Sequence, residues 1–196
     1  KKSHILLGRY LADQMSEVYS LQQHRKAFCL GNIMPDLRPS FLTTRHEFFG
    51  TFSQLQEKMR ELIERNPEED NARVYWRRFG EVMHYMADYF TFPHNRTYKG
   101  SLAEHNSYEA ELKNCLKECI LSGNADSQLE EAKHFDSFEE LVGYIRERHA
   151  CYLESPRCIA DDIRFILRVC YQVIQGIFQL CLRRQFHMEG RPVTAI

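Results

Sequence analysis

The stretch HYMADYFTFPHNRTYKGSLAEHNSYE, from His84 to Glu109, is the part of this chain that decides its organisation. It contains two histidine–carboxylate pairs with a spacing of four, His84 with Asp88 and His105 with Glu109, and His94 lies between the pairs just after a proline. Residues four apart share one face of a helix, with Cβ atoms about 5–6 Å apart, so each pair can direct two ligands at one metal ion. Two such pairs on either side of a break predict a shared metal site.

The same stretch indicates two helices that meet at Pro93. Apolar side chains recur at intervals of three and four from about Glu69 to Phe92, which predicts an amphipathic helix. Proline disfavours helical backbone in the residue before it, so Pro93 should end this helix. A second helix is expected from about Gly100 to Leu121, where Gly123 and its neighbour stop it.

Helical periodicity extends through the rest of the chain. Gly31 and Pro35 should end a helix and turn the chain just before Asp36. No strand-like alternation of useful length occurs. We expect further helices over about residues 4–20, 46–65, 138–153 and 158–185. The sequence therefore predicts an all-α protein, with six or more helices in one bundle-like domain over residues 1–196.

Composition places the chain among globular proteins, with 43% hydrophobic and 27% charged residues. Its 26 basic and 27 acidic residues give a net charge of −1, which offers no electrostatic case for a nucleic-acid partner. The most apolar segment, residues 163–182, still contains Arg164, Arg168 and three glutamines, too many polar groups for a lipid-exposed span. We therefore expect a core helix there and no transmembrane segment.

The cysteines bear on the cellular compartment. There are seven, an odd number, and most fall at apolar helical positions, which favours a reducing environment over a disulfide framework. The start of the sequence shows no secretion signal. We expect a cytoplasmic protein, with secretion as the alternative; the sequence does not determine the oligomeric state.

The candidate metal ligands are all imidazoles and carboxylates, a mixture that suits Zn²⁺ and related divalent ions. One tetrahedral site cannot use so many donors, so two or three ions are expected. Asp88 lies between two histidine-bearing segments and could bridge two ions, the arrangement that clamps both the attacking and the leaving oxygen of a phosphoester. The candidates are His4, Asp36, His46, His84, Asp88, His94, His105 and Glu109.

Each candidate also has a simpler interpretation. His84 with Asp88 could be a buried hydrogen-bonded pair, and His105 with Glu109 a solvated helix pair. Asp36, which follows a proline, could be a turn residue. Each simpler interpretation is the stronger one for its own residues, and the metal site is favoured only when the pairs are taken together.

The order of these motifs resembles that of the zinc-dependent phospholipase C family, all-α hydrolases related in fold to the P1/S1 nucleases. The matching pieces are SHILLG around His4, GNIMPD ending in Asp36, His46 after a loop, HYMADYFTFPH, and EHNSYE. Together they span about the first 110 residues. Beyond them the resemblance is only in being helical.

The resemblance implies a role for each residue. Asp36, His46, His84 and Asp88 would hold a first zinc, and His94, His105 and Glu109 a second. A third would use His4 and the bridging Asp88; secreted family members add an N-terminal tryptophan, whereas the one tryptophan here is Trp76. Site residues matching in type, order and spacing make this resemblance specific.

We therefore expect a metal-dependent hydrolase of phosphate esters, most simply a phosphodiester such as a phospholipid head group. Metal-bound water would attack phosphorus, and Asp36 could act as a general base beside the bridging Asp88. One alternative is a P1/S1-like nuclease or nucleotidase. Another is a non-catalytic helical module that binds metal for structure or sensing, and a plain interaction bundle would bind none.

Overall fold

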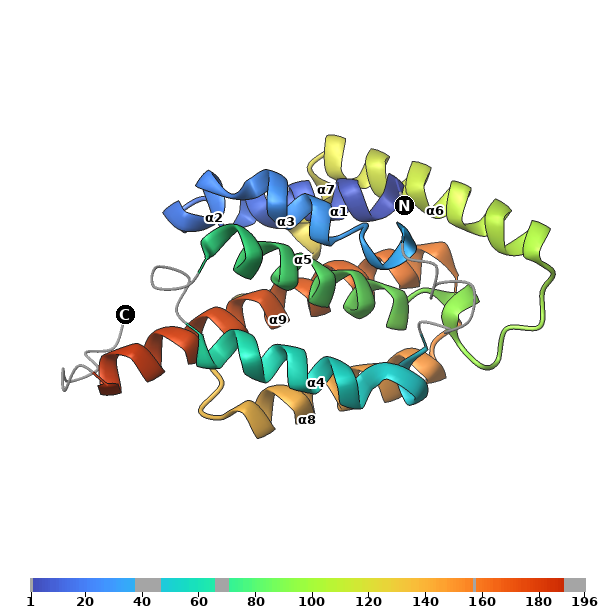
Figure 1. Cartoon of the computed structure of the whole chain (residues 1–196). Helices are drawn as coiled ribbons and strands as arrows, with labels where there is room; N and C mark the ends of the chain where they lie inside the picture. The colour runs from blue at the N-terminus through green and yellow to red at the C-terminus, as the bar shows by residue number, and fades with distance from the viewer. Residues whose placement is uncertain (1, 38–46, 66–70, 157, 189–196) are drawn as a thin grey trace.

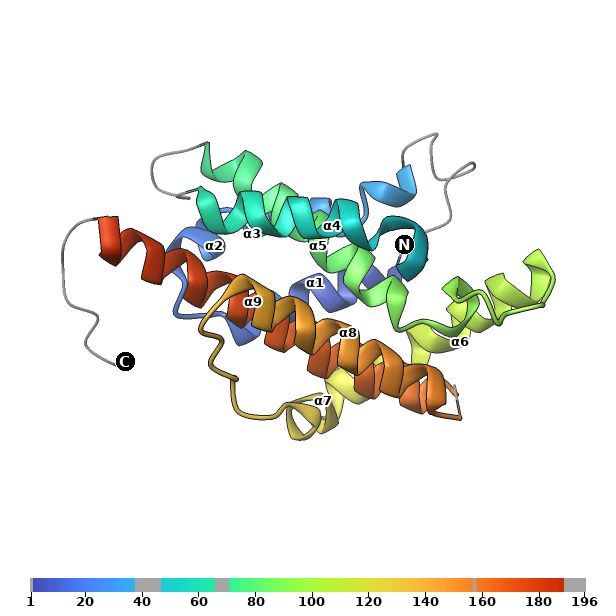
Figure 2. The same cartoon turned by 90° about the horizontal axis from the view of Figure 1, so that it is seen from below.

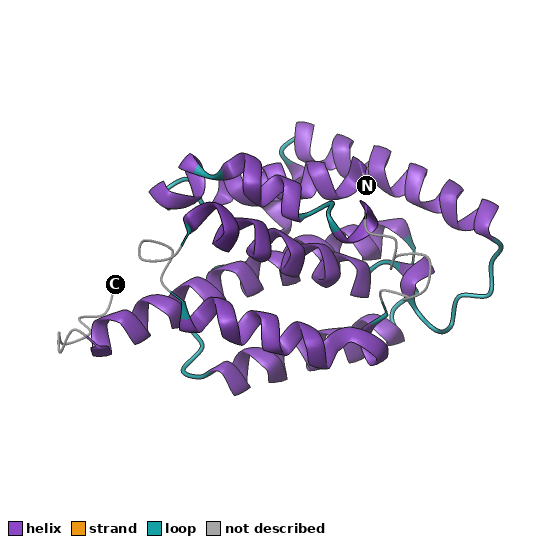
Figure 3. Cartoon of the chain, in the orientation of Figure 1, coloured by secondary structure: helices purple, strands orange, loops and turns teal. Residues whose placement is uncertain are grey.

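The regular structure of the chain is helical throughout the part that can be described. The computed structural model describes residues 2–37, 47–65, 71–156 and 158–188. No strand occurs among these residues (Figure 3), which confirms the all-α prediction. The elements are α1 (Lys2–Gln14), α2 (Tyr19–Gln23), α3 (Arg25–Gly31), η1 (Pro35–Leu37), α4 (Phe48–Glu64), α5 (Ala72–Tyr89), η3 (Phe92–His94), α6 (Leu102–Leu121), α7 (Asn124–Gln128), α8 (Phe138–Glu154) and α9 (Ile159–Met188).

Helix α5 lies in the middle of the bundle. Helices α1, α3 and α6 run along one side of it, and α4 and α8 along the other (Figure 1). It packs against α1, α3, α4 and α9, and α9 in turn packs against α4 and α8, as the view from below shows (Figure 2). The helix that carries His84 and Asp88 is thus surrounded by other helices, and its polar face is buried.

Apolar side chains of α5 and α9 form much of the core. Trp76 stacks on Phe79 with ring centroids 5.5 Å apart, and Phe28 from α3 meets both rings edge-on. On α9, Val173 and Ile177 are fully buried. Removing this apolar area from water provides the main stabilisation of the bundle, about 25 cal/mol per Å².

Helix α9 is long and apolar enough, between Ile159 and Gln185, to cross a membrane by length and composition alone. In the structure, however, 61% of its most apolar window is buried against other helices. Its buried Gln172 accepts a hydrogen bond from the backbone N–H of Lys133 and donates one to the carbonyl of Glu131. Helix α9 therefore occupies the position of the core helix that the sequence predicts.

Helix α1 ends at Gln14, earlier than the predicted end near residue 20. The Gln22 side chain donates to the carbonyls of Ala12 and Met15, at 2.8 and 3.1 Å. Because these carbonyls lie at the end of α1, the amide caps them and a separate short helix, α2, follows. The sequence pattern was apolar at both helices and did not reveal this cap.

Helices α5 and α6 are also shorter than predicted at the ends that face the candidate site. Helix α5 ends at Tyr89 instead of Phe92, because the N–H of Phe92 donates to the Asp162 side chain at 2.9 Å instead of continuing the helix. Helix α6 begins at Leu102, since Ser101 and Glu104 form a capping box in which each side chain accepts from the other's backbone N–H.

Candidate metal centre

Helix α5 presents His84 and Asp88 on one buried face, as their spacing predicts. His84 is 0% and Asp88 1% exposed, and His84 Nε2 lies 3.1 Å from Asp88 Oδ2. Burying a carboxylate is costly unless it is paired or coordinates a metal. Asp88 is therefore paired with His84 inside the core, an arrangement that a buried hydrogen-bonded pair and a metal site share.

His4 joins this pair from the first turn of α1. Its Nε2 lies 3.1 Å from Asp88 Oδ1, and its ring centroid lies 4.1 Å from that of His84. The ligand atoms of these three residues all lie within 4.8 Å of one another. The other nitrogen of His4, Nδ1, is buried and has no hydrogen-bond partner among the described residues.

A second cluster forms where η3 meets α6. Glu109 Oε1 lies 3.0 Å from His105 Nε2 and 3.3 Å from His94 Nε2. The three ligand atoms again lie within 4.8 Å of one another, and all three residues are partly exposed. This cluster unites the second predicted pair with the histidine that follows the proline break.

Asp88 connects the two clusters. Its Oδ1 faces His4 and also lies 3.8 Å from His94 Nε2, while its Oδ2 faces His84. A small cavity of about 20 Å³ is lined by His4, Asp88, His94 and Glu109. The carboxylate thus occupies the position between histidine-bearing segments that the sequence analysis assigned to it.

The two remaining candidates come from the segment between α3 and α4. Asp36 lies on the short helix η1, and its Oδ1 is 3.7 Å from His84 Nε2. The structure therefore brings Asp36 to the first cluster. His46 lies outside the described residues.

A close contact between two helices orients the His84 ring. Its Nδ1 lies 2.8 Å from the carbonyl oxygen of Asn32, at the end of α3, so Nδ1–H donates and Nε2 is left to face Asp88. Asn32 can approach because α3 and α5 meet at glycines: a Cβ on Gly80 would lie 2.1 Å from the Phe28 carbonyl, and one on Gly31 2.0 Å from that of Arg77. Only glycine allows the backbones to come this near.

The turn that carries His94 is held by a buried polar network. The Asn95 side chain donates to the carbonyl of Thr91 at 2.9 Å, and its Oδ1 lies 3.3 Å from His149 Nε2. The His149 ring stacks on Phe48 with centroids 4.0 Å apart. The turn between α5 and α6 is therefore fixed against α4 and α8.

Burial and neighbouring charges shift the pKa values of Asp88 and His4. Burial acts to raise the pKa of Asp88, but attraction to His94, His84 and His4 outweighs it and holds this pKa well below its usual range. Burial lowers the pKa of His4, and repulsion from His84 lowers it further. A neutral His4 beside an ionised Asp88 has the protonation that metal binding needs.

At His84, His94 and Glu109 too, the effect of burial on the pKa opposes that of the neighbouring charges. Burial lowers the pKa of His84 and His94, yet the Asp88 carboxylate outweighs it, so the pKa of each is raised. For Glu109, burial is outweighed by hydrogen bonds from His105 and His94, and its pKa is lowered. In the absence of a cation, the carboxylates thus favour the protonated form of these histidines. A metal ion that binds them would displace those protons.

The donor set fits zinc. Imidazole nitrogen and carboxylate oxygen are ordinary zinc ligands, the ligand atoms converge, and the buried Asp88 carboxylate has a charge that a bound cation would compensate. We find no comparable convergence of histidines elsewhere among residues 2–37, 47–65, 71–156 and 158–188.

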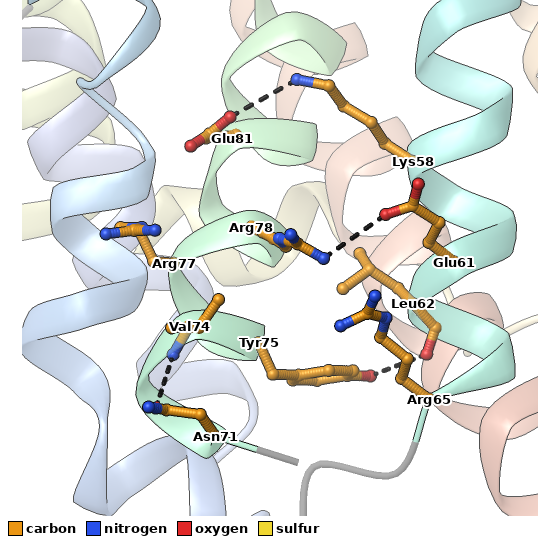
Figure 4. Close-up of a pocket in the computed structure, with 10 residues that line it drawn as sticks. All are labelled: Lys58, Glu61, Leu62, Arg65, Asn71, Val74, Tyr75, Arg77, Arg78 and Glu81. Carbon is orange, nitrogen blue, oxygen red and sulfur yellow. Dashed lines mark hydrogen bonds and ion pairs between the residues drawn. The ribbon is translucent and has the colours of Figure 1, made fainter.

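A larger cavity, of about 440 Å³, lies between α4 and α5 away from the clusters (Figure 4). It is lined by basic and acidic side chains, and no histidine is among its lining residues. Lys58 lies 3.4 Å from Glu81, and Arg78 lies 3.5 Å from Glu61, so its charges pair across the two helices. It lacks the imidazole donors of the histidine clusters.

Comparison with protein families agrees with this geometry. Residues 3–159 match the model of the family described as zinc dependent phospholipase C. The chain belongs to this family. Searches of curated proteins and of solved structures found no match. The matched segment contains all eight candidate ligands, and membership in the zinc-dependent phospholipase C family indicates metal-dependent phosphodiester hydrolysis.

Several residues that shape the site were not identified from the sequence. Asn32 acts through its backbone carbonyl, a contact that the residue type does not indicate. Asn95 immediately follows His94, and that adjacency is the signal that could have drawn attention to it. Asp162, an acidic residue in the first turn of α9, is fully buried, and its side chain accepts from the N–H of Phe92 two residues before His94.

Proposed function

We propose that the protein hydrolyses a phosphodiester, such as the head-group ester of a phospholipid, at a site holding two or three zinc ions. The observation that carries the proposal is Asp88, a buried carboxylate that faces His4, His84 and His94 from three different elements. Such a carboxylate at the junction of two donor clusters is suited to hold ions close together.

The donor sets proposed for the ions are those that the family resemblance implies. Asp36, His46, His84 and Asp88 would hold one ion; His94, His105 and Glu109 would hold another; and His4 with Asp88 would hold a third. Zinc bound there would supply Lewis-acid chemistry, lowering the pKa of water and offsetting charge on phosphate oxygens.

The side chains of the chain have separate tasks in this proposal. His84 is held by the Asn32 carbonyl with Nε2 toward the cluster, so its ring needs no reorientation during the reaction. Asp36, on a short helix beside the first cluster, accepts the proton of the attacking water as a general base. Substrate would enter at the cluster of His94, His105 and Glu109, because its residues are partly exposed whereas those of the His4 cluster are buried.

Substitution of the junction carboxylate tests the proposal. Asp88→Asn keeps the size of the side chain but removes its charge, and we expect bound zinc to fall and turnover of phosphatidylcholine to drop at least about a hundredfold. Asp136→Asn, at an exposed aspartate that pairs with Arg183 at 2.9 Å, is the matched control and should behave as wild type. Wild-type turnover in Asp88→Asn would contradict the proposal.

The choice of substrate identifies the chemistry further. Wild-type protein should release phosphorylated head group from phosphatidylcholine in preference to cleaving single-stranded DNA. The reverse preference would indicate a nuclease instead. Stoichiometric zinc with no turnover of either substrate would indicate a metal-binding module without catalysis.

A further inference from the structure

Asp162, in the first turns of α9, is a fully buried carboxylate with three hydrogen-bond donors from three other elements. Its Oδ2 accepts from the N–H of Phe92 at 2.9 Å and from the hydroxyl of Tyr108 at 2.8 Å. Its Oδ1 accepts from the hydroxyl of Tyr152 at 2.6 Å. One side chain therefore ties η3, α6 and α8 to α9.

Two of these three bonds reach the segments that carry the second donor cluster. Phe92 lies two residues before His94 on η3, and Tyr108 lies immediately before Glu109 on α6. Both donors meet the same oxygen, Oδ2, so a single atom joins η3 to α6. His94 and Glu109, which must converge within hydrogen-bond distance, come from these two elements.

All three partners are neutral donors, and burial without a cation is unfavourable enough to raise the pKa of Asp162 to about 6. A carboxylate accepts at both oxygens, whereas an amide would place an NH₂ group against one donor. The hydroxyl of Tyr152 could turn to accept from it, but the N–H of Phe92 could not.

We propose that Asp162 is a positioning residue for the metal site, which sets the distance between His94 on η3 and Glu109 on α6. It rests on the proposed zinc-dependent function, and it extends that site beyond the family-matched segment, which ends at residue 159. Helix α9 is then part of the architecture of the metal centre and not only a core helix.

Two single-atom deletions separate positioning from stability. Tyr108→Phe removes the bond to the ligand-bearing helix α6, and Tyr152→Phe removes the bond to α8, which carries no candidate ligand. Each deletes one hydroxyl from the same carboxylate, so both should lower the thermal midpoint. We expect only Tyr108→Phe to weaken zinc binding, by about tenfold or more, as loss of a supporting contact does at other metal sites.

The full removal of the carboxylate extends the test. In Asp162→Ala we expect the zinc content after dialysis against a weak chelator to fall by the ion of the His94 cluster. Asp162→Asn, with its oxygen toward Phe92 and Tyr108 and its NH₂ toward Tyr152, should restore most of it. Zinc per chain is measured by atomic absorption, and circular dichroism reports whether each variant is folded.

The outcomes distinguish this inference from the function on which it rests. Equal zinc affinity in Tyr108→Phe and Tyr152→Phe would overturn the positioning role, as would wild-type zinc content in Asp162→Ala. If Asp162→Ala does not fold, the two tyrosine variants still decide the question. A wild-type protein that binds no zinc would instead overturn the proposed function.

Discussion

Acidification should destabilise the protein through His149, a histidine outside the metal site. Its ring is only 2% exposed and stacks on Phe48, and burial lowers its pKa from 6.5 to about 4. Between these values the unfolded chain binds a proton that the folded protein does not. The stability that His149 contributes is therefore complete above pH 6.5 and is lost as the pH falls toward 4.

The size of the effect follows from the two pKa values. Proton linkage gives a loss of about 2 kcal/mol at pH 5 and about 3 kcal/mol at pH 4 relative to pH 7. Asp162 acts in the opposite direction in the same range, because burial raises its pKa to about 6 and its protonation favours the folded state. The wild-type curve alone would therefore conceal the contribution of His149.

Comparing His149→Gln with the wild type isolates the contribution of His149 to the pH dependence of stability. His149→Gln keeps a donor near Asn95 but has no proton to gain, so its stability relative to wild type should improve by about 2 kcal/mol between pH 7 and pH 5. Urea unfolding can be followed by the fluorescence of Trp76, the single tryptophan, which is fully buried. The metal site is common to both proteins, so its own pH dependence cancels in the difference.

A second substitution on α8 controls for loss of stability that does not depend on pH. Ile145→Val removes one methyl group from a fully buried side chain one turn before His149, and should cost about 1 kcal/mol equally at both pH values. A His149→Gln difference that is the same at pH 5 and pH 7 would refute the burial argument.

Other predictions concern the helix contacts that support the site. Gly80→Ala should destabilise the protein by about 3 kcal/mol, because its Cβ would lie 2.1 Å from the Phe28 carbonyl, whereas Gly143→Ala, with open space around it, should be neutral or slightly stabilising; urea unfolding compares them. Ser101→Ala should cost about 1 kcal/mol by removing the cap of α6, and zinc titration should show weaker binding at the cluster that α6 carries. Removal of zinc by a chelator should lower the thermal midpoint, and added zinc should restore it; a midpoint insensitive to both would contradict metal binding by the folded state.

Local sequence signals predicted the pieces of the site better than their boundaries. Proline and glycine placed the breaks near Pro93 and Gly123 correctly, because their effect on the backbone is local. The predicted ends of α1 and α5 were wrong, since Gln22 and Asp162 bond to backbone groups from outside those helices. The capping box at Ser101 is a local signal that the prediction did not use.

The sequence by itself determined the helical class and the two ligand pairs, since a spacing of four places His84 with Asp88, and His105 with Glu109, on shared helix faces whatever the rest of the chain does. Only the tertiary structure decided that His94 connects the second pair to Asp88, and that Asn32 and Asp162 support the segments that carry these residues. These contacts join residues 52 and 70 positions apart, through a backbone carbonyl and a buried side chain. Periodicity describes a single helix and its faces, whereas such contacts depend on how helices pack, which is determined by the close approach of α3 to α5 and by the burial of α9.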